Sequence, residues 1–293
     1  MKDLLASLRR GPLLFDGASG TMLSATPGVR FHAPEEFLLR LPQRVLEIHQ
    51  QYVEAGAQVI HTSTFGANRI KLARVGLEAQ AVEMNRTAAR LACEAAGDAI
   101  PVVGSIGPTG ELLTPLGELT FERARDAFTE QATALAECGA DALVVETMSD
   151  LREARAAIEG VRAATKLPVI CTMTFDNRLR TMMGVTPRQA VASLLELGAD
   201  VVGANCGVGP EATLRAIQEM RQARPDALLA AKPNAGVPRL VGDRTIYDIG
   251  PEVFAEYVPK FVEAGVRLIG ACCGSTPDYT RSMAARLAVL KGH

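Results

Sequence analysis

The feature that most constrains the fold is a repeated alternation of short apolar runs with longer amphipathic segments. Eight apolar runs occur, at residues 12–15, 58–61, 100–104, 142–145, 168–173, 201–204, 227–230 and 267–270. They lack polar alternation, as is typical of parallel strands that are buried on both faces. The segments between them, such as residues 122–138, place Ala, Phe and Leu at helical spacing. This spacing predicts helices with one apolar stripe.

Eight strand–helix units without a linker favour an α/β fold, a single (β/α)8 TIM barrel, over a doubly wound open sheet. The chain has 293 residues, a length that suits either two domains or one barrel. Because composition does not change along the chain, we expect one barrel domain over residues 1–293. The connections over 21–42, 108–119 and 232–250 are long, and long βα loops belong to the C-terminal, functional face of a barrel.

Helix ends are also marked in the sequence. Gly56 and Gly139 follow helical segments, where glycine can adopt the left-handed conformation that closes a helix. Ser149 or Asp150 can cap the helix that follows, and Thr186 precedes a proline that suits a first helical position.

Composition excludes several classes of partner. The chain has 31 basic and 33 acidic side chains, and it lacks the clustered Lys and Arg that nucleic acid or an anionic membrane would require. The first residues, MKDLLASLRRGPLLFDG, lack the apolar core of a signal peptide, and no run approaches the ~20 apolar residues of a membrane span. We therefore expect a cytoplasmic protein whose six cysteines remain thiols.

Polar side chains gather where the predicted strands end. In a barrel, side chains at the carboxyl ends of the strands point into a common mouth. The residues at these positions are Asp16, 62–65, Ser105, Glu146, Asn205, Cys206, 232–234, Cys272 and Cys273. The spacing therefore predicts one site.

Three of the cysteines, Cys206, Cys272 and Cys273, follow strands six and eight. Thiolate sulfur selects zinc, and three protein ligands leave a fourth position open, as in catalytic zinc sites. Adjacent cysteines in a regular strand face opposite ways, so both could bind one ion only from a bend, which Gly270 and Gly274 permit. The alternative is that all three are small apolar core residues. That is our interpretation of the other three, Cys93, Cys138 and Cys171.

The remaining mouth residues allow two interpretations each. Asp16 could cap a turn, and the glycines beside it, Gly17 and Gly20, could shape the backbone or expose N–H groups to a substrate carboxylate. Glu146 ends an apolar run, so it needs a cationic partner, either a bound ammonium group or an internal Arg. We interpret His49 and His61 as structural residues rather than metal ligands.

Seven motifs, taken in order, resemble the homocysteine S-methyltransferase family over essentially the full chain. They are LFDGASGTML (14–23), HTSTFGANR (61–69), GSIGPTG (104–110), VVETMSD (144–150), GANCG (203–207), AKPNAG (231–236) and GACCGSTPDY (270–279). Within the family the pattern is similar to the N-terminal homocysteine-binding module of cobalamin-dependent methionine synthases and to the N-terminal half of bifunctional methyltransferase and methylenetetrahydrofolate reductase proteins. Family members often have Met where this sequence has Ser19, and Asn where it has Ser63. Neither difference removes a catalytic group.

The resemblance implies roles for individual residues. Cys206, Cys272 and Cys273 would hold Zn²⁺ and carry the catalysis, and Asn234 matches a position near the metal. Asp16 and Glu146 would contact the ammonium group of L-homocysteine. The backbone of Gly17, Ala18, Ser19 and Gly20, together with Ser105, would receive its carboxylate.

The implied reaction is methyl transfer to the thiol of L-homocysteine, giving L-methionine. A free thiol has a pKa near 8.5, and coordination to zinc removes its proton, which generates the nucleophile. Betaine, S-methylmethionine or S-adenosylmethionine as donor would favour an aromatic cage, but the chain has no Trp and four Tyr. We therefore expect methylcobalamin as donor. Because the chain ends just after the eighth helical segment, we expect a separate corrinoid-binding module or protein to present it.

Two other functions fit parts of the pattern. A metal-independent barrel lyase could use Lys232 as an amine nucleophile, although it would leave the three mouth cysteines unexplained. A non-enzymatic binding module could contain a zinc ion that is closed by a fourth protein ligand.

Overall fold

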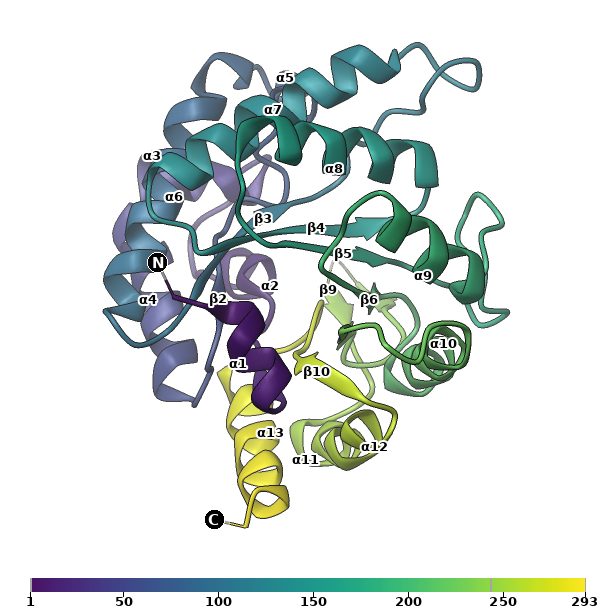
Figure 1. The fold of residues 1–293 in the computed structure, drawn as a ribbon. Coiled ribbons are helices and arrows are strands. Elements are labelled where there is room, and N and C mark those ends of the chain that lie inside the picture. The colour runs from purple at the N-terminus through teal and green to yellow at the C-terminus, as the bar shows by residue number, and fades with distance from the viewer. Residues whose placement is uncertain (1, 243, 293) are drawn as a thin grey trace.

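The computed structural model describes residues 2–242 and 244–292, and eight parallel strands form its central sheet (Figure 1). The strands are β1 (Leu13–Leu14), β2 (Ile60–His61), β3 (Val102–Ile106), β4 (Ala142–Met148), β5 (Val169–Met173), β6 (Val201–Cys206), β7 (Leu229–Pro233) and β10 (Val266–Ile269). Each overlaps one predicted run. Strands β3, β4, β6 and β7 extend two or three residues beyond the predicted ends, because backbone pairing continues where the side chains become polar.

The order of the strands confirms the barrel and excludes the doubly wound sheet. Neighbouring strands follow β1-β10-β7-β6-β5-β4-β3-β2, and a parallel bridge between Phe15 and Val59 joins the two ends of this series. The Asp16 N–H donates to the Val59 carbonyl at 3.0 Å, and the Val59 N–H donates to the Leu14 carbonyl at 3.0 Å. The sheet therefore curls back on itself in the TIM-barrel manner.

Helices cover the outside of the sheet (Figure 1). They are α1 (Leu4–Arg10), α2 (Ser19–Ser24), α3 (Phe37–Arg40), α4 (Pro42–Glu54), α5 (Arg69–Ala73), α6 (Ala81–Ala96), α7 (Phe121–Glu137), α8 (Leu151–Ala164), α9 (Pro187–Glu196), α10 (Pro210–Ala223), α11 (Pro251–Ala255), α12 (Tyr257–Glu263) and α13 (Pro277–Leu290). The predicted ends are confirmed. Asp150 caps α8, Thr186 caps α9, and Gly56 and Gly139 have positive φ after α4 and α7.

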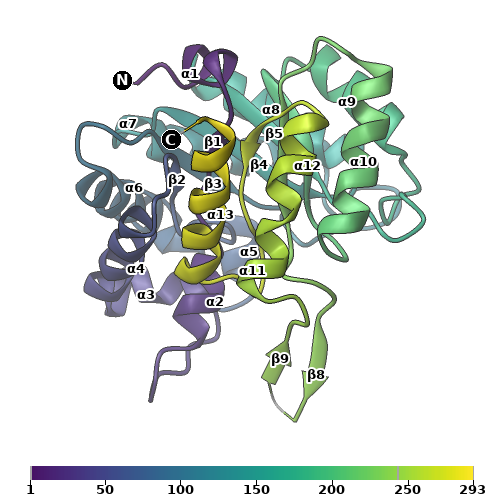
Figure 2. The same cartoon turned by 90° about the horizontal axis from the view of Figure 1, so that it is seen from below.

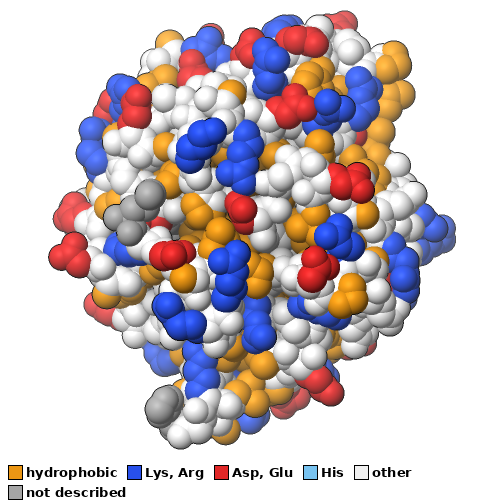
Figure 3. Space-filling view, in the orientation of Figure 1, with side chains coloured by type: hydrophobic (Ala, Val, Ile, Leu, Met, Phe, Trp, Pro, Cys, Tyr) orange, Lys and Arg blue, Asp and Glu red, His pale blue; other side chains and the backbone are white. Residues whose placement is uncertain are grey.

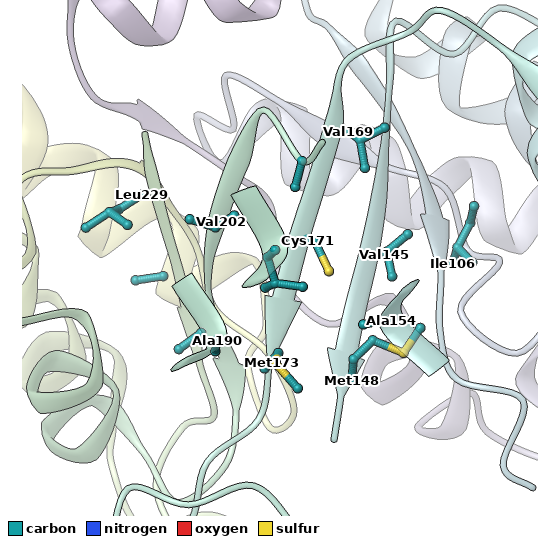
Figure 4. Close-up of a cluster of buried hydrophobic side chains, with 14 of the residues drawn as sticks. Ile106, Val145, Met148, Ala154, Val169, Cys171, Met173, Ala190, Val202 and Leu229 are labelled. Atoms are coloured by element: carbon teal, nitrogen blue, oxygen red, sulfur yellow. The ribbon is translucent and has the colours of Figure 1, made fainter. Parts of the chain in front are cut away.

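The core has one layer inside the barrel and another between the sheet and the helices. Val103, Val144 and Ile170 belong to the inner layer. Their neighbours along the strands face outward, as Figure 4 shows for Val145 and Cys171. Cys171 is fully buried there, which confirms its core assignment, while Cys93 and Cys138 are half-buried and pack at the edges of the core clusters.

The two ends of the barrel differ. Helix α1 lies across the amino end, where Leu4 and Leu8 pack against the inner layer. At the opposite end a hairpin projects from the molecule (Figure 2), formed by β8 (Arg239–Val241) and β9 (Arg244–Ile246). The sequence predicted only a long polar connection here, because each strand has just three residues. Leu240, in the middle of β8, is exposed.

The surface agrees with the nearly neutral composition. Basic and acidic side chains are interspersed on the face shown in Figure 3. Within the described residues, no helix combines the length and apolar character needed to span a bilayer.

Candidate functional site

Three cysteines converge at the carboxyl end of the barrel. Cys206 ends β6, and Cys272 and Cys273 follow β10. Their Sγ atoms all lie within 4.8 Å of one another, and those of Cys206 and Cys273 are 3.9 Å apart. All three residues are partly exposed. The predicted convergence of these residues is therefore present in the structure.

Backbone bends bring the cysteines together. Cys206 itself has φ +61°, and Gly274 has φ +83° directly after the cysteine pair. The loop that follows β7 ties the two bends, because its Asn234 N–H donates to the Cys206 carbonyl at 3.3 Å and its Ala235 N–H donates to the Cys273 carbonyl at 3.0 Å. The glycine bend at Gly274 follows the sequence prediction, whereas the left-handed cysteine has no signal in the sequence.

The geometry of the cysteines fits a tetrahedral zinc ion. Zn–S bonds near 2.3 Å place two sulfur atoms of a tetrahedron about 3.8 Å apart. Asn234 supplies a further observation, because its Oδ1 is buried and has no hydrogen-bond partner among the described atoms. Its Nδ2 donates to the Gly207 carbonyl at 2.7 Å, which fixes the side chain beside the cysteine cluster. The donor set is therefore three thiols with a buried oxygen nearby.

The thiols also influence each other electrostatically. Hydrogen bonds to Cys272 and Cys273, together with burial, raise the pKa of Cys206. The pKa of Cys273 is lowered because the Cys206 and Cys272 thiols donate hydrogen bonds to it. Three adjacent thiols therefore cannot all ionise unless a cation offsets their charge.

Two buried carboxylates lie at the same end of the barrel, and each has a partner. Asp16 accepts from the His61 N–H at 3.0 Å and pairs with the His61 ring Nδ1. Glu146 accepts from the Ser105 hydroxyl at 2.6 Å and pairs with Lys232 Nζ at 3.2 Å. The internal cation beside Glu146 is therefore a lysine, where the sequence suggested an arginine or a bound ammonium group.

The segment after β1 is tightly packed at its start and open further on. A Cβ atom on Gly17 would lie 2.7 Å from Ser275 Oγ, and the Ala18 N–H donates to that same oxygen at 3.0 Å. Ser19 begins α2, and Gly20 has open space around it. The Ala18 N–H is therefore used within the protein. The N–H of Ser105 is used in the same way, since it donates to Thr62 Oγ1 at 2.9 Å.

Asn205 has a larger part in this site than the sequence indicated. Its Oδ1 accepts from the Thr147 N–H at 2.8 Å and from Thr172 Oγ1 at 2.7 Å, and its Nδ2 donates to Thr147 Oγ1 at 2.7 Å. Nδ2 also lies 3.9 Å from Cys272 Sγ. The period of two along β5 and β6 could have predicted that Thr172 and Asn205 share the barrel interior.

Tyr247 was also missed, because it lies in the long connection after β7. Its half-buried ring packs against Gly274, where an added Cβ would overlap ring atoms. Burial and the neighbouring cysteines, Cys273 foremost, raise the pKa of Tyr247 to about 12. The base of the hairpin thus contacts the cysteine cluster.

Comparison with known proteins places the chain in one family. The family profile described as "Homocysteine S-methyltransferase" matches residues 13–287. The chain belongs to the homocysteine S-methyltransferase family. This membership confirms the resemblance drawn from the seven motifs.

Individual relatives within the family agree. Methionine synthase of Mycobacterium tuberculosis is 34% identical to this chain over an alignment of 308 positions, which includes 99% of this chain and 26% of that protein. Methionine synthase of Mycobacterium leprae is 33% identical over 98% of this chain and 25% of that protein. The metallated form of the homocysteine methyltransferase MmuM from Escherichia coli superposes with a TM-score of 0.76 at 28% identity, covering 96% of this chain and 99% of that one. The chain thus spans about a quarter of the length of the methionine synthases.

Proposed function

We propose that this protein is a zinc-dependent methyltransferase that transfers a methyl group to the thiol of L-homocysteine and forms L-methionine. The observation that carries the proposal is the cluster of three Sγ atoms within 4.8 Å, placed at the barrel end that also holds two buried carboxylates. Membership of the homocysteine S-methyltransferase family supports it. A Lys-dependent lyase is not favoured, because Lys232 is salt-bridged to Glu146 and its pKa is raised.

Cys206, Cys272 and Cys273 would hold the zinc ion, and Asn234 Oδ1, which has no partner of its own among the described residues, would occupy the fourth position when substrate is absent. Zinc, when bound, lowers the pKa of the substrate thiol so that it reacts as a thiolate. Asn205 orients this cluster through its contacts with Cys272 and Thr147. Binding of substrate sulfur would displace Asn234 and complete a four-sulfur shell.

The remaining residues of the site would bind the amino-acid part of the substrate. Asp16 and Glu146 would receive the ammonium group, each held in place by its own partner. The backbone over Gly17–Gly20 would receive the carboxylate. Since the N–H groups of Ala18 and Ser105 already donate within the protein, the carboxylate would use the other N–H groups of that segment, while the Ser105 hydroxyl orients Glu146.

The donor we propose is methylcobalamin carried by another module or protein. The low aromatic content, with no Trp, disfavours a cage for betaine, S-methylmethionine or S-adenosylmethionine. The methionine synthases that resemble this chain are about four times as long, which agrees with a donor module outside residues 1–293. We further propose that residues 1–293 form one homocysteine-binding domain.

Zinc analysis and X-ray absorption spectroscopy of the purified chain test the proposal. We expect about one zinc per chain, with three sulfur ligands and one oxygen or nitrogen ligand before substrate is added. L-homocysteine should convert this shell to four sulfur ligands. Absence of zinc, or a four-sulfur shell already complete without substrate, would overturn the proposed mechanism. Methyl transfer from free methylcobalamin, compared with S-methylmethionine, S-adenosylmethionine and betaine, then tests the donor.

A further inference from the structure

Lys232 is a buried cation whose role the proposed mechanism leaves open. Its Nζ lies 3.2 Å from Glu146 Oε2 and 4.3 Å from the centre of the Phe15 ring, and the residue is only 3% exposed. A lysine is rarely buried to this extent, because removing an ammonium group from water is costly unless it is paired.

The barrel is shaped to hold this side chain. Lys232 lies two positions after Ala230 in β7, so the two side chains share one face of the strand. Ala230 belongs to the inner core layer, and the stem of Lys232 therefore also points inward. A Cβ atom on Gly270 of the adjacent segment would lie 3.1 Å from Lys232 Cγ and 2.9 Å from Phe15 Cβ. The absence of a side chain at Gly270 therefore leaves room for the lysine stem beside Phe15.

The charges around Lys232 keep it protonated. Burial opposes the charged form, but the ion pair with Glu146 at 3.2 Å and the contact with the Phe15 ring at 4.3 Å stabilise the ammonium group. Counted as formal charges, the Asp16 and Glu146 carboxylates and the Lys232 ammonium group sum to −1. One further ammonium group would make the pocket neutral.

We propose that Lys232 sets the net charge of the Asp16–Glu146 pocket so that it accepts one substrate ammonium group, and thereby determines the preference for an amino-acid thiol. The inference rests on the proposed function, which places the homocysteine ammonium at these carboxylates. Without Lys232, two carboxylates would share one buried pocket and only one cation would be available from the substrate. Lys232 is thus a specificity-determining residue rather than a nucleophile.

A charge-restoration experiment tests this role. Dissociation constants of L-homocysteine and of 4-mercaptobutyrate, which lacks the ammonium group, are measured by calorimetry on zinc-loaded wild type, Glu146→Gln and the double variant Glu146→Gln/Lys232→Met. Glu146→Gln raises the net formal charge of the pocket from −1 to 0, so the substrate ammonium group is no longer needed for neutrality, and we expect the preference for homocysteine to fall at least about tenfold. The double variant returns the pocket to −1 through Asp16 alone, and we expect it to recover most of that loss.

The outcomes separate the possible roles of Lys232. A double variant that prefers homocysteine no more than Glu146→Gln does would overturn the inference. If the double variant binds both thiols more tightly or more weakly than Glu146→Gln by the same factor, Lys232 acts on the substrate carboxylate instead. That result would also overturn the inference. A wild type that binds neither thiol would overturn the proposed function as well, which distinguishes the two failures.

Two further variants guard against indirect effects. Lys260 lies 4.4 Å from the Tyr257 ring on the surface, so Lys260→Met removes a similar lysine–aromatic contact outside the pocket and should leave the preference unchanged. If the double variant lacks the cooperative thermal transition of the wild type, Glu146→Gln/Lys232→Gln replaces it in the experiment. This variant should also recover most of the lost preference, and a preference no greater than that of Glu146→Gln would overturn the inference.

Discussion

The Sγ atoms of Cys206 and Cys273 lie 3.9 Å apart, although 67 positions separate the two residues in the chain. This separation is close to the distance of about 3.8 Å between two sulfur ligands of one tetrahedral zinc ion. The strands that carry the cysteines are joined through β7, whose loop bonds to both sides of the cluster. The fold alone therefore brings the ligands into position.

Replacing Cys273 by serine should remove both the metal and the activity. A serine hydroxyl keeps its proton at neutral pH and is a poor zinc ligand, so the zinc content should fall from about one per chain to below about 0.1. The circular dichroism spectrum should be unchanged, because the side chain is not part of the buried core. Elemental analysis measures the metal. Cys93→Ser is the matched control and should retain zinc. A Cys273→Ser variant that still binds zinc and is active would contradict the assignment of Cys273 as a zinc ligand.

Replacing Asn205 by alanine should weaken both the fold and the metal site. The change leaves the Thr147 N–H and the Thr172 hydroxyl without their acceptor, which should cost about 2–3 kcal/mol of unfolding free energy. Zinc affinity should fall roughly 10- to 100-fold, because the support of Cys272 is lost. Urea unfolding and chelator competition measure the two effects.

The control for Asn205 is another buried asparagine. Asn85 donates to the carbonyls of Ala67 and Ala81 at 2.8 and 2.7 Å, away from the cysteines. Asn85→Ala should reduce stability to a similar extent and leave zinc affinity unchanged. Equal losses of zinc affinity in both variants would show that Asn205 acts only through general stability.

His49 should make the protein less stable in acid. The side chain is fully buried, and burial lowers its pKa from 6.5 to about 4, so the unfolded chain binds more protons between these values. Stability should therefore fall as the pH decreases from about 6.5 to about 4, by roughly 3 kcal/mol from this residue. His49→Leu should remove this part of the decline at little cost at pH 7, since neither ring nitrogen has a hydrogen-bond partner among the described residues.

Urea unfolding at pH 7 and pH 4.5 measures this difference. His32 is exposed, so His32→Gln should leave the decline as it is in the wild type. An identical decline in wild type and His49→Leu would show that other groups cause the acid sensitivity.

Replacing Gly203 by alanine should disrupt the barrel. A methyl group at this position in β6 would overlap the Ala230 carbonyl oxygen of β7, and neither backbone can move without breaking the parallel pairing. We expect a loss of at least about 3 kcal/mol. Thermal unfolding measures it. Gly250→Ala is the control, because a Cβ atom there meets nothing within 4 Å, and it should leave the melting temperature within about 2 °C of the wild type. A similarly mild effect of Gly203→Ala would contradict the close packing of β6 on β7.

Much of the fold follows from the sequence because apolar periodicity and helix caps are local signals. Thr186 and Asp150 cap the expected helices, and all eight predicted runs lie in the sheet. The strand ends were predicted too early, since Ser105 and Lys232 are polar yet continue their strands inside the barrel. The hairpin was missed because strands of three residues leave no periodic pattern.

The site was predicted in part. Convergence of the cysteines follows from topology, which places the ends of parallel strands at one mouth. Pairings such as Glu146 with Lys232 or Asp16 with His61 depend on which side chains meet across the barrel, and single positions in a sequence do not specify this. The left-handed backbone of Cys206 is likewise set by its tertiary surroundings.

Helix α1 has a kinetic consequence. With Leu4 and Leu8 sealing the amino end, the mouth is the route by which both reactants of the proposed reaction arrive and by which methionine departs. In the proposed reaction, homocysteine would then bind before a donor protein covers the opening, and the product would leave only after that donor withdraws. The proposed reaction should accordingly follow a compulsory order of binding, with homocysteine before the donor.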